Sequence, residues 1–455
     1  MQDTIKIKKG LDIKLVGEPA KVIESYSTKY FAITPENFKW LTPKLLVKEG
    51  DSVLIGDPLF FAKENESLKI VAPVSGTITR IFRGEKRKIV HIEIESDGYF
   101  KSVDTKQQMK WETSSEIKDT MLHFGLWPMV RQRPYGTIAN PEQKPKAIFI
   151  NCFDSAPLAP DIHFLLKEKY DVFLKGIEIM AKLTDGPLFL TVQAGSPLLE
   201  MFKNEAQIQK ELSEIKNCKI VPFSGPHPAG TVGIQIHHLA PIQKGDVVWT
   251  VEPQNVCAIG NLFLNHILDF SKIIAVTGGS VKNPHYYSLI QGASVKELLE
   301  GNLTHDEVRV ISGNVLTGSN IGKEGFLGFY DDQITVIPES EQRDLFGWIM
   351  PNFHKFSVSR TFFSFLMPNK KYNIDTRLYG GHRVLMFTDI YSKVFPFDLL
   401  PDQLLKACII KDIEMMESLG IYEIVEEDYA LCEFVCPSKT DCQQIVKDAI
   451  WELVK

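Results

Sequence analysis

Turn-forming residues divide the first hundred or so residues of the chain into short segments. Gly, Asp and Pro cluster at Glu49–Asp51, Gly56–Pro58, Ser75–Gly76 and Asp97–Gly98. The runs between these clusters alternate apolar and polar residues, which is typical of strands with one buried face, and the clusters are typical of the connections between strands. The N-terminal part of the chain is therefore predicted to be all-β.

Two segments of this part suggest a particular barrel. Val47–Leu59 and Val71–Ile78 together resemble the barrel-sandwich hybrid of biotinyl and lipoyl carriers. A carrier presents a modifiable lysine at a hairpin tip, and counting back from Gly76 without gaps places Asn65 there. The nearest lysines are Lys63 and Lys69. We therefore expect a docking barrel without a covalent cofactor.

The pattern changes after residue 145, where apolar runs begin to alternate with a helical pattern. Ala147–Asn151, Leu188–Val192 and Lys219–Pro222 have the composition of buried strands, and Asn204–Lys216 has the spacing of an amphipathic helix. Alternation of strands and helices predicts a sheet covered by helices, as in Rossmann-like domains.

A further unit is predicted to begin near Lys272. Ile274–Val281 and Val308–Leu316 have strand composition, and Gly292–Leu299 between them is predicted to form a short helix that starts at a serine. This order resembles the β-grasp domain that binds soluble ligands, known as SLBB.

The last third of the chain is predicted to end in helices. Pro401 stands where a first helical residue belongs, and Gly420 stands where a helix ends. Apolar residues between them recur at helical spacing, which predicts a core-facing stripe. These residues are Leu405, Ile409, Ile413 and Met416.

Together these patterns predict a multidomain fold of the α/β plus β class. We assign residues 1–105 to a biotinyl/lipoyl-like barrel-sandwich domain and residues 106–255 to a Rossmann-like α/β domain. Residues 256–335 are assigned to an SLBB-like β-grasp domain, and residues 336–455 to a mostly helical C-terminal domain.

Charge and apolar run lengths limit the possible functions. The formal net charge is −6, which argues against binding to a nucleic-acid backbone and against direct adhesion to an anionic membrane. No apolar run reaches the ~18–20 residues that span a bilayer, and no apolar signal segment follows Met1. Seven unevenly spaced cysteines suit reduced thiols. We expect a cytoplasmic protein that reaches a membrane only through a partner.

Five blocks of sequence carry a family resemblance. They are Lys9–Ile13, Phe223–Gly233, Thr376–Arg383, Asp398–Pro401 and Glu426–Pro437. Their order and spacing resemble the NqrA family, which is one of the subunits of the bacterial Na⁺-translocating NADH:quinone oxidoreductase. The domain series is also similar to the C subunit of the Rnf complex and, more distantly, to the NADH- and flavin-binding subunit of respiratory complex I.

The resemblance implies a peripheral subunit on the cytoplasmic side of the bacterial membrane. Its partners would be the other subunits of the complex, especially the membrane subunits, and it would assist assembly and the quinone-reducing end. The family reaction converts NADH and quinone to NAD⁺ and quinol and couples this to Na⁺ export. Flavins and Fe–S clusters are expected on other subunits.

The glycine-rich motifs of nucleotide and flavin sites are missing from the sequence. No G-x-G-x-x-G fingerprint occurs. Gly318–Lys323 imitates a phosphate loop, but it is one residue short and is followed by Glu324, where such a loop needs Ser or Thr. The Gly-Arg-Gly-Gly flavin loop of the complex I relative is also missing. We therefore expect no flavin or nucleotide in this chain.

Cysteine spacing suggests the remnant of an Fe–S segment. Cys432 and Cys436 match the second half of a bacterial ferredoxin motif, but Glu426 and Tyr429 stand where its first two thiolates belong. We therefore predict no cluster, no metal ligand and no catalytic residue here. The alternative, an electron-carrying flavin or Fe–S subunit of an Rnf-like complex, stays open at this point.

One segment has the composition of a quinone contact. A segment from about Leu126 to Pro145, rich in Pro, Arg and Gln, is predicted to be a loop, and it combines aromatic rings with arginines. A quinone site needs an apolar slot and donors to the carbonyl oxygens, but an interdomain or intersubunit loop fits equally and is slightly favoured. His227, between two prolines, is predicted to fix a functional or docking turn. The candidate residues for contact with quinone or a partner are Trp127, Arg131, Arg133, Tyr135 and His227.

Overall fold

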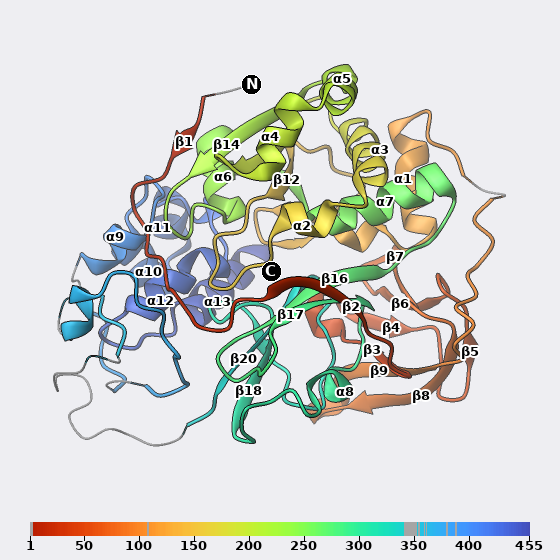
Figure 1. Ribbon diagram of the computed structural model, residues 1–455. Coiled ribbons are helices and arrows are strands. Elements are labelled where there is room, and N and C mark those ends of the chain that lie inside the picture. Colours follow the sequence, from red (N-terminus) through yellow and green to blue (C-terminus); the bar gives the residue numbers. More distant parts are fainter. Residues whose placement is uncertain are drawn as a thin grey trace.

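The computed structural model describes most of the 455-residue chain. The described residues are 3–106, 109–340, 353, 355–358, 360, 362–378, 381–386 and 389–455. Residues 379–380 of the predicted Thr376–Arg383 block, and residues 341–352 at the start of the predicted C-terminal domain, lie outside them. In Figure 1 the α/β part lies at the top, the barrel at the lower right, the β-grasp part at the bottom and the C-terminal helices at the left.

The N-terminal barrel is all-β, as predicted. It consists of a four-stranded sheet in the order β3-β9-β8-β5 and a three-stranded sheet in the order β4-β6-β7, with antiparallel neighbours throughout. Alternate side chains of each strand form the core between the sheets. The strands are β3 (Tyr30–Ile33), β4 (Pro43–Leu45), β5 (Ser52–Val53), β6 (Pro58–Ala62), β7 (Asn65–Val71), β8 (Gly76–Arg83) and β9 (Ile89–Ser96).

The tip of the β6–β7 hairpin differs from the gapless prediction. Ala62 faces Asn65 across the hairpin, so the two-residue tip is formed by the exposed Lys63 and Glu64. Asn65 is the first residue of β7, and its side-chain oxygen accepts a hydrogen bond from the Ser67 amide. The prediction that Asn65 occupies the tip is therefore wrong. The cause is an irregular strand register, because β7 carries extra residues that a gapless count does not include.

The α/β part is built on a seven-stranded sheet in the order β1-β14-β13-β12-β15-β10-β11. The first five strands in this order are parallel, while β10 and β11 are antiparallel additions. The central order β14-β13-β12-β15 is that of half a Rossmann fold, as predicted. The strands are β1 (Ile5–Lys6), β10 (Val130–Arg133), β11 (Thr137–Ile138), β12 (Ala147–Cys152), β13 (Leu188–Gln193), β14 (Cys218–Ser224) and β15 (Val248–Val251).

Helices pack on both faces of this sheet (Figure 1). The strands between them are buried on both faces and consist almost wholly of apolar residues, which explains their sequence pattern. The helices are α1 (Ser114–His123), α2 (Ile162–Leu166), α3 (Tyr170–Ala181), α4 (Pro197–Asn204), α5 (Ala206–Glu214), α6 (Val232–Leu239) and α7 (Pro253–Asn265).

The segment from Leu126 to Pro145 is not the loop that we predicted. It forms a 3₁₀ turn over Trp127–Met129 and then strands β10 and β11, which extend the sheet beyond β15. Strand β10 has only four residues, two of them arginines, and Pro134 ends it. A strand this short and this charged has no strand signal in its sequence, and its position depends on pairing with β15.

The β-grasp part has a six-stranded sheet in the order β19-β18-β20-β16-β17-β2. The N-terminal segment crosses between domains, since β1 pairs with β14 of the α/β sheet and β2 pairs with β17 of this sheet. Figure 1 shows this segment passing along the front of the molecule. The elements are β2 (Ala20–Ser25), β16 (Ser271–Thr277), β17 (His285–Ile290), α8 (Lys296–Leu299), β18 (Val308–Ser312), β19 (Ser319–Asn320) and β20 (Gln333–Pro338).

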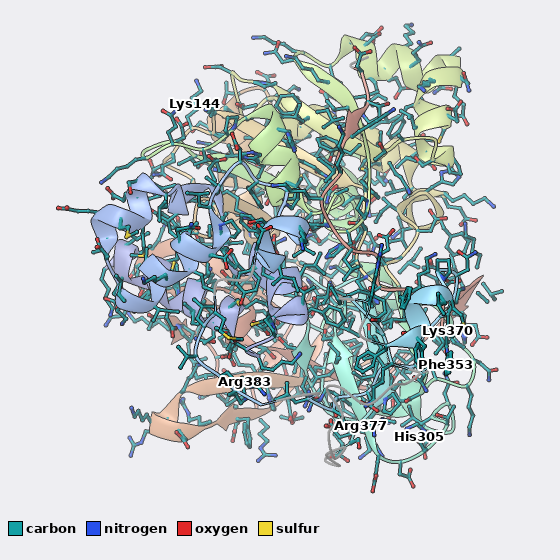
Figure 2. The ribbon with its side chains drawn as sticks, turned by 90° about the vertical axis from the view of Figure 1, so that its left-hand side faces the viewer. Lys144, His305, Phe353, Lys370, Arg377 and Arg383 are labelled. Carbon is teal, nitrogen blue, oxygen red and sulfur yellow. The ribbon has the colours of Figure 1, made fainter. Side chains whose placement is uncertain are left out.

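The C-terminal part is helical, as predicted. Figure 2, which views the molecule from the side of these helices, shows them between the α/β part above and barrel strands below. In the described parts of the chain, no helix has the length and apolar character that crossing a bilayer requires. The helices are α9 (Ile390–Val394), α10 (Pro401–Ile410), α11 (Ile413–Ser418), α12 (Ala430–Val435) and α13 (Cys442–Val454).

The predicted core stripe of this part is only half correct. Pro401 is the first residue of α10, as predicted, and both Leu405 and Met416 are fully buried. However, Ile409 is 46% exposed and Ile413 is 45% exposed. The helix breaks at Lys411, whose backbone is left-handed, so α11 starts with a new orientation and the stripe does not continue.

Candidate functional site

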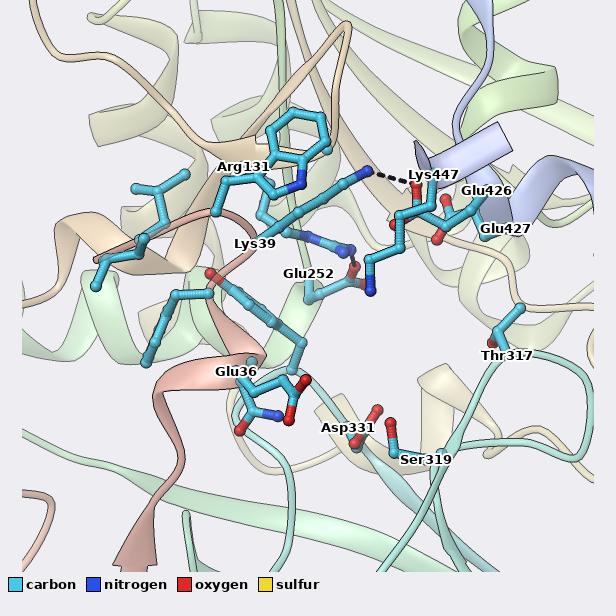
Figure 3. A pocket seen from close by; sticks show the side chains of 18 of the residues that line it. Glu36, Lys39, Arg131, Glu252, Thr317, Ser319, Asp331, Glu426, Glu427 and Lys447 are labelled. Atoms are coloured by element: carbon cyan, nitrogen blue, oxygen red, sulfur yellow. Dashed lines mark hydrogen bonds and ion pairs between the residues drawn. The ribbon is translucent and has the colours of Figure 1, made fainter. Parts of the chain in front are cut away.

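A cavity of about 980 Å³ lies where the four parts of the molecule meet. The barrel contributes the turn around Lys39, and the α/β sheet contributes strand ends and loops. The β-grasp part contributes the turn around Asp331, and the C-terminal helices contribute Glu426 and Lys447. Figure 3 shows these side chains converging from different ribbons. The cavity is therefore a product of the domain arrangement and not of one domain.

The cavity lies at the carboxyl edge of the α/β sheet. Asn151 ends β12 and Asp154 follows it, Glu252 follows β15, and His227 lies in the loop after β14. The chain leaves β12 toward β13 on one side, while β15 joins on the other, so the strand order reverses between β12 and β15. Ligands of open α/β sheets bind in the crevice at this switch point. The position favours a ligand site.

Arg131 projects from β10 into this cavity. Its guanidinium donates a hydrogen bond to Glu252 at 2.8 Å and lies 4.8 Å from the centre of the Tyr330 ring (Figure 3). Burial raises the pKa of Glu252 although Arg131 acts against the shift. A guanidinium has five N–H donors, so Arg131 can bind a further acceptor in the cavity.

Arg133, two residues further along β10, is buried within the chain. Only 4% of it is exposed. Its guanidinium donates to Asp428 at 2.9 Å and also pairs with Glu427, both in the 3₁₀ turn Glu426–Tyr429 of the C-terminal part. Burial raises the pKa of Asp428, while Arg133 acts in the opposite direction. Arg133 thus joins the α/β sheet to the C-terminal helices.

The two aromatic candidates on this segment also pack inside the molecule. Trp127 is fully buried, its indole N–H donates to the Ala139 carbonyl at 2.7 Å, and its ring meets Trp249 edge-on. Tyr135 is half-buried, and its ring packs between Trp40 and Tyr422. Neither residue is among those that line the cavity.

His227 lines the cavity from the loop between β14 and α6. Its backbone N–H donates to the Asp12 carboxylate at 2.9 Å, and its Nδ1 lies 3.1 Å from the Ser155 hydroxyl. Burial lowers the pKa of His227 to about 4, although Asp12 and the Ser155 backbone act to raise it. The imidazole is therefore neutral at pH 7.

Three of the sequence blocks that carry the family resemblance meet beside this cavity. Asp12 of the first block holds the His227 loop of the second block. A Cβ atom on Gly233 of the second block would lie 2.3 Å from a carboxylate oxygen of Asp428, which belongs to the block Glu426–Pro437. The close approach requires glycine at position 233 and explains why these distant residues form one pattern.

Sequence reasoning missed several residues of the site. Trp40 and Trp451 line the cavity with their ring centres 5.2 Å apart, and Lys39 lies over the Trp40 ring and pairs with Glu426. Asp154 also lines the cavity, and desolvation raises its pKa to about 6. Each stands alone in the sequence, and the fold alone brings them together.

The segments that resemble cofactor motifs have ordinary structural roles. Gly318–Lys323 contains the short strand β19 and a turn, and no helix follows it. Cys432 and Cys436 are buried around α12, where the Tyr391 hydroxyl donates to the Cys436 sulfur at 2.9 Å. Among the residues described, no group of three or more His, Cys, Asp or Glu is arranged to hold a metal ion.

Comparison with known proteins points to one family. Residues 5–97 match the model of the NqrA N-terminal barrel-sandwich hybrid domain, residues 112–267 that of the NqrA second alpha/beta domain, and residues 273–323 that of the NQRA C-terminal domain, of the SLBB type. These matches agree with the barrel, α/β and β-grasp parts of the fold.

Full-length relatives give the same result. The chain is 34% identical over 454 residues to the A subunit of the Na(+)-translocating NADH-quinone reductase of Yersinia pestis bv. Antiqua (strain Angola), covering 99% of both chains. It is 34% identical over 455 residues to that of Rhodopirellula baltica, covering 98% of this chain and 97% of the relative. A solved structure of an NAD+-reducing [NiFe]-hydrogenase in the air-oxidized state aligns with 77% of this chain and 62% of its own, at 12% identity. Its TM-score of 0.42 carries no argument.

Proposed function

The chain belongs to the NqrA family of the Na⁺-translocating NADH-quinone reductase, and on this premise we propose that it contacts the quinone from a peripheral position in such a complex. Its relatives match over their whole length, which favours the NqrA interpretation over an electron-carrying Rnf-like subunit. Its partners are the other subunits, with the membrane subunits supplying attachment on the cytoplasmic side. NADH oxidation, flavin transfer and sodium movement belong to those partners.

The cavity supports the proposed quinone contact. Ligand pockets commonly have volumes of about 300–1,000 Å³, aromatic walls and a few fixed polar groups. This cavity has Trp40, Trp451 and Tyr330 on its walls, and it receives donors from Arg131 and His227. It therefore offers what a quinone head group needs, a slot for the ring and donors for its carbonyl oxygens.

The burial of two candidate residues decides between the two roles considered for the segment Phe124–Tyr135. Trp127 and Arg133 are buried by the chain itself, so neither can reach a partner without unfolding this region. Arg131 keeps donors that face the cavity. We therefore favour quinone contact by Arg131 and His227, with Trp127, Arg133 and Tyr135 holding strand β10 and its following turn in place.

Binding of a short-chain ubiquinone to the isolated chain tests this proposal directly. We expect saturable quenching of tryptophan fluorescence, because Trp40 and Trp451 lie on the cavity wall. Substitution of both by phenylalanine should remove most of the quenching and leave the affinity, measured by calorimetry, within about twofold. Absence of any saturable binding to the folded chain would refute the quinone contact.

We also expect the purified chain to be colourless. It lacks a dinucleotide fingerprint and the flavin loop, and two of the four thiolates of a ferredoxin motif are replaced by Glu426 and Tyr429. The measurement is a visible absorption spectrum after gel filtration, with the assembled complex as the coloured control. A stoichiometric flavin or cluster band that stays with the isolated chain would favour the electron-carrying alternative.

A further inference from the structure

The His227 side chain is held by hydrogen bonds that fix its orientation. The Ser155 hydroxyl oxygen accepts a hydrogen bond from the Gly230 amide at 2.8 Å and lies 3.1 Å from His227 Nδ1. On the opposite side, the His227 amide donates to Asp12, and the His227 carbonyl accepts from the Leu11 amide at 2.7 Å. Both faces of the loop are thus fixed by segments far away in the sequence.

These contacts also determine where the imidazole carries its hydrogen. A serine hydroxyl has one hydrogen to donate. Since Ser155 already accepts from Gly230, its own hydrogen is directed at Nδ1, which must then be the unprotonated nitrogen. Burial keeps the ring neutral at pH 7, because it lowers the pKa to about 4. The ring hydrogen therefore lies on Nε2.

The Nε2–H group has no partner in the protein. No hydrogen bond to it is formed by any residue that the structure describes, although only 8% of His227 is exposed and the residue lines the cavity. A donor that is almost fully buried and unpaired is costly, so its presence on the wall of a cavity indicates a ligand acceptor.

The charges around this corner of the cavity restrict the ligand further. Asp154, Glu252 and Asp332 all line the same cavity, and the nearest guanidinium, that of Arg131, is already paired with Glu252. A phosphate or carboxylate placed here would meet these carboxyl groups and be repelled. An uncharged carbonyl oxygen accepts a hydrogen bond without this penalty.

We propose that His227 is the fixed neutral donor of the cavity and that its Nε2–H binds an uncharged carbonyl oxygen of the ligand. Ser155 and Asp12 are positioning residues, which set the tautomer and the orientation of the ring. The ligand class rests on the proposed function, because a quinone supplies such an oxygen. The tautomer and its cause are properties of this chain alone and can be tested without any ligand.

The first experiment determines the tautomer by NMR of the full chain labelled with ¹⁵N at histidine. The His227 signals are identified by their loss in His227→Gln, and they should show a protonated Nε2 and an unprotonated Nδ1 from pH 6 to pH 8. Ser155→Ala should shift the tautomer equilibrium, and Ser155→Thr, which retains a hydroxyl, should restore it. A protonated Nδ1, or a charged ring at pH 7, would overturn the assignment.

The second experiment measures binding of a short-chain ubiquinone to the same variants. His227→Leu should weaken binding by roughly 10-fold, because one hydrogen bond is lost, while His227→Gln should retain part of the affinity. Inorganic phosphate should not compete. His305→Gln is the matched control, because His305 is exposed and lies at the edge of the molecule in Figure 2.

The two experiments separate the two proposals. If the wild-type chain has the expected tautomer but binds no quinone, the proposed quinone contact fails and the ligand class fails with it, while the donor assignment holds. If the wild-type chain binds quinone and His227→Leu binds it equally well, the quinone contact holds and the role of His227 is refuted. Competition by phosphate would show an anion site instead.

Discussion

Replacing Arg133 with alanine is expected to lower the free energy of unfolding of this chain by about 3–5 kcal/mol. Removing one member of a buried ion pair leaves the other charge without compensation. Here Asp428 would remain in the protein interior, with its side chain fully buried. The pair also joins strand β10 to the C-terminal helices, so the loss should affect the contact between two parts of the fold. Chemical denaturation of the isolated chain measures the effect.

Two further variants test the cause of this loss. Asp428→Ala should be destabilising to a similar extent, and the double variant with Arg133→Ala should be less destabilised than the sum, because both charges are then absent. Lys144→Ala removes an exposed pair with Asp185 at the edge of the molecule (Figure 2) and should change stability by less than about 1 kcal/mol. Equal effects of Arg133→Ala and Lys144→Ala would mean that Arg133 is not buried as described.

Stability loss in Arg133→Ala separates two interpretations of the segment Phe124–Tyr135. If this segment met a partner protein directly, Arg133→Ala would weaken assembly while the isolated chain kept its stability. The buried contacts of Arg133 instead predict that the isolated chain itself is weakened. Assembly would then fall only as a consequence of unfolding.

The sequence was most informative where the pattern of one strand or helix is local. The buried strands β12, β13 and β14 were predictable because strands covered on both faces need continuous apolar runs. The barrel strands were predictable because turn residues separate them. Strand β10 was not, because its arginines have partners from distant segments, Glu252 for Arg131 and Asp428 for Arg133.

The break between α10 and α11 shows a second limit. Helical spacing predicted one stripe from Leu405 to Met416, yet the chain adopts a left-handed conformation at Lys411. Lysine has no intrinsic preference for this conformation. The break is set by packing against other elements, which spacing alone does not report.

The site shows the same limit. Arg131 and His227 could be proposed because arginine beside aromatic residues, and histidine between prolines, are unusual locally. Lys39, Asp154 and Trp451 could not, because they come from the barrel, the α/β loops and the last helix. Their common feature is a cavity that exists only when the domains are assembled.

Replacing Arg131 with alanine is expected to raise the quinone KM of the assembled complex on the order of 10- to 100-fold. A hydrogen bond to a charged group contributes roughly 1.5–3 kcal/mol, which corresponds to that range. Arg131 faces the cavity and uses one donor on Glu252, so its remaining donors are available to a quinone carbonyl. Arg131→Lys should recover part of the affinity, because lysine retains the charge but not the planar set of donors. The measurement is NADH-driven quinone reduction at varied quinone concentration.

Arg309→Ala provides the matched control. Arg309 also forms a partly exposed pair with a glutamate, Glu339, at 2.8 Å, but it lies on β18 and does not line the cavity. Its loss should leave the quinone KM unchanged. A fall in the yield of assembled complex with an unchanged KM would assign Arg131 to docking. Normal assembly with wild-type kinetics would exclude both roles, because the guanidinium would then serve only to neutralise Glu252 inside the cavity.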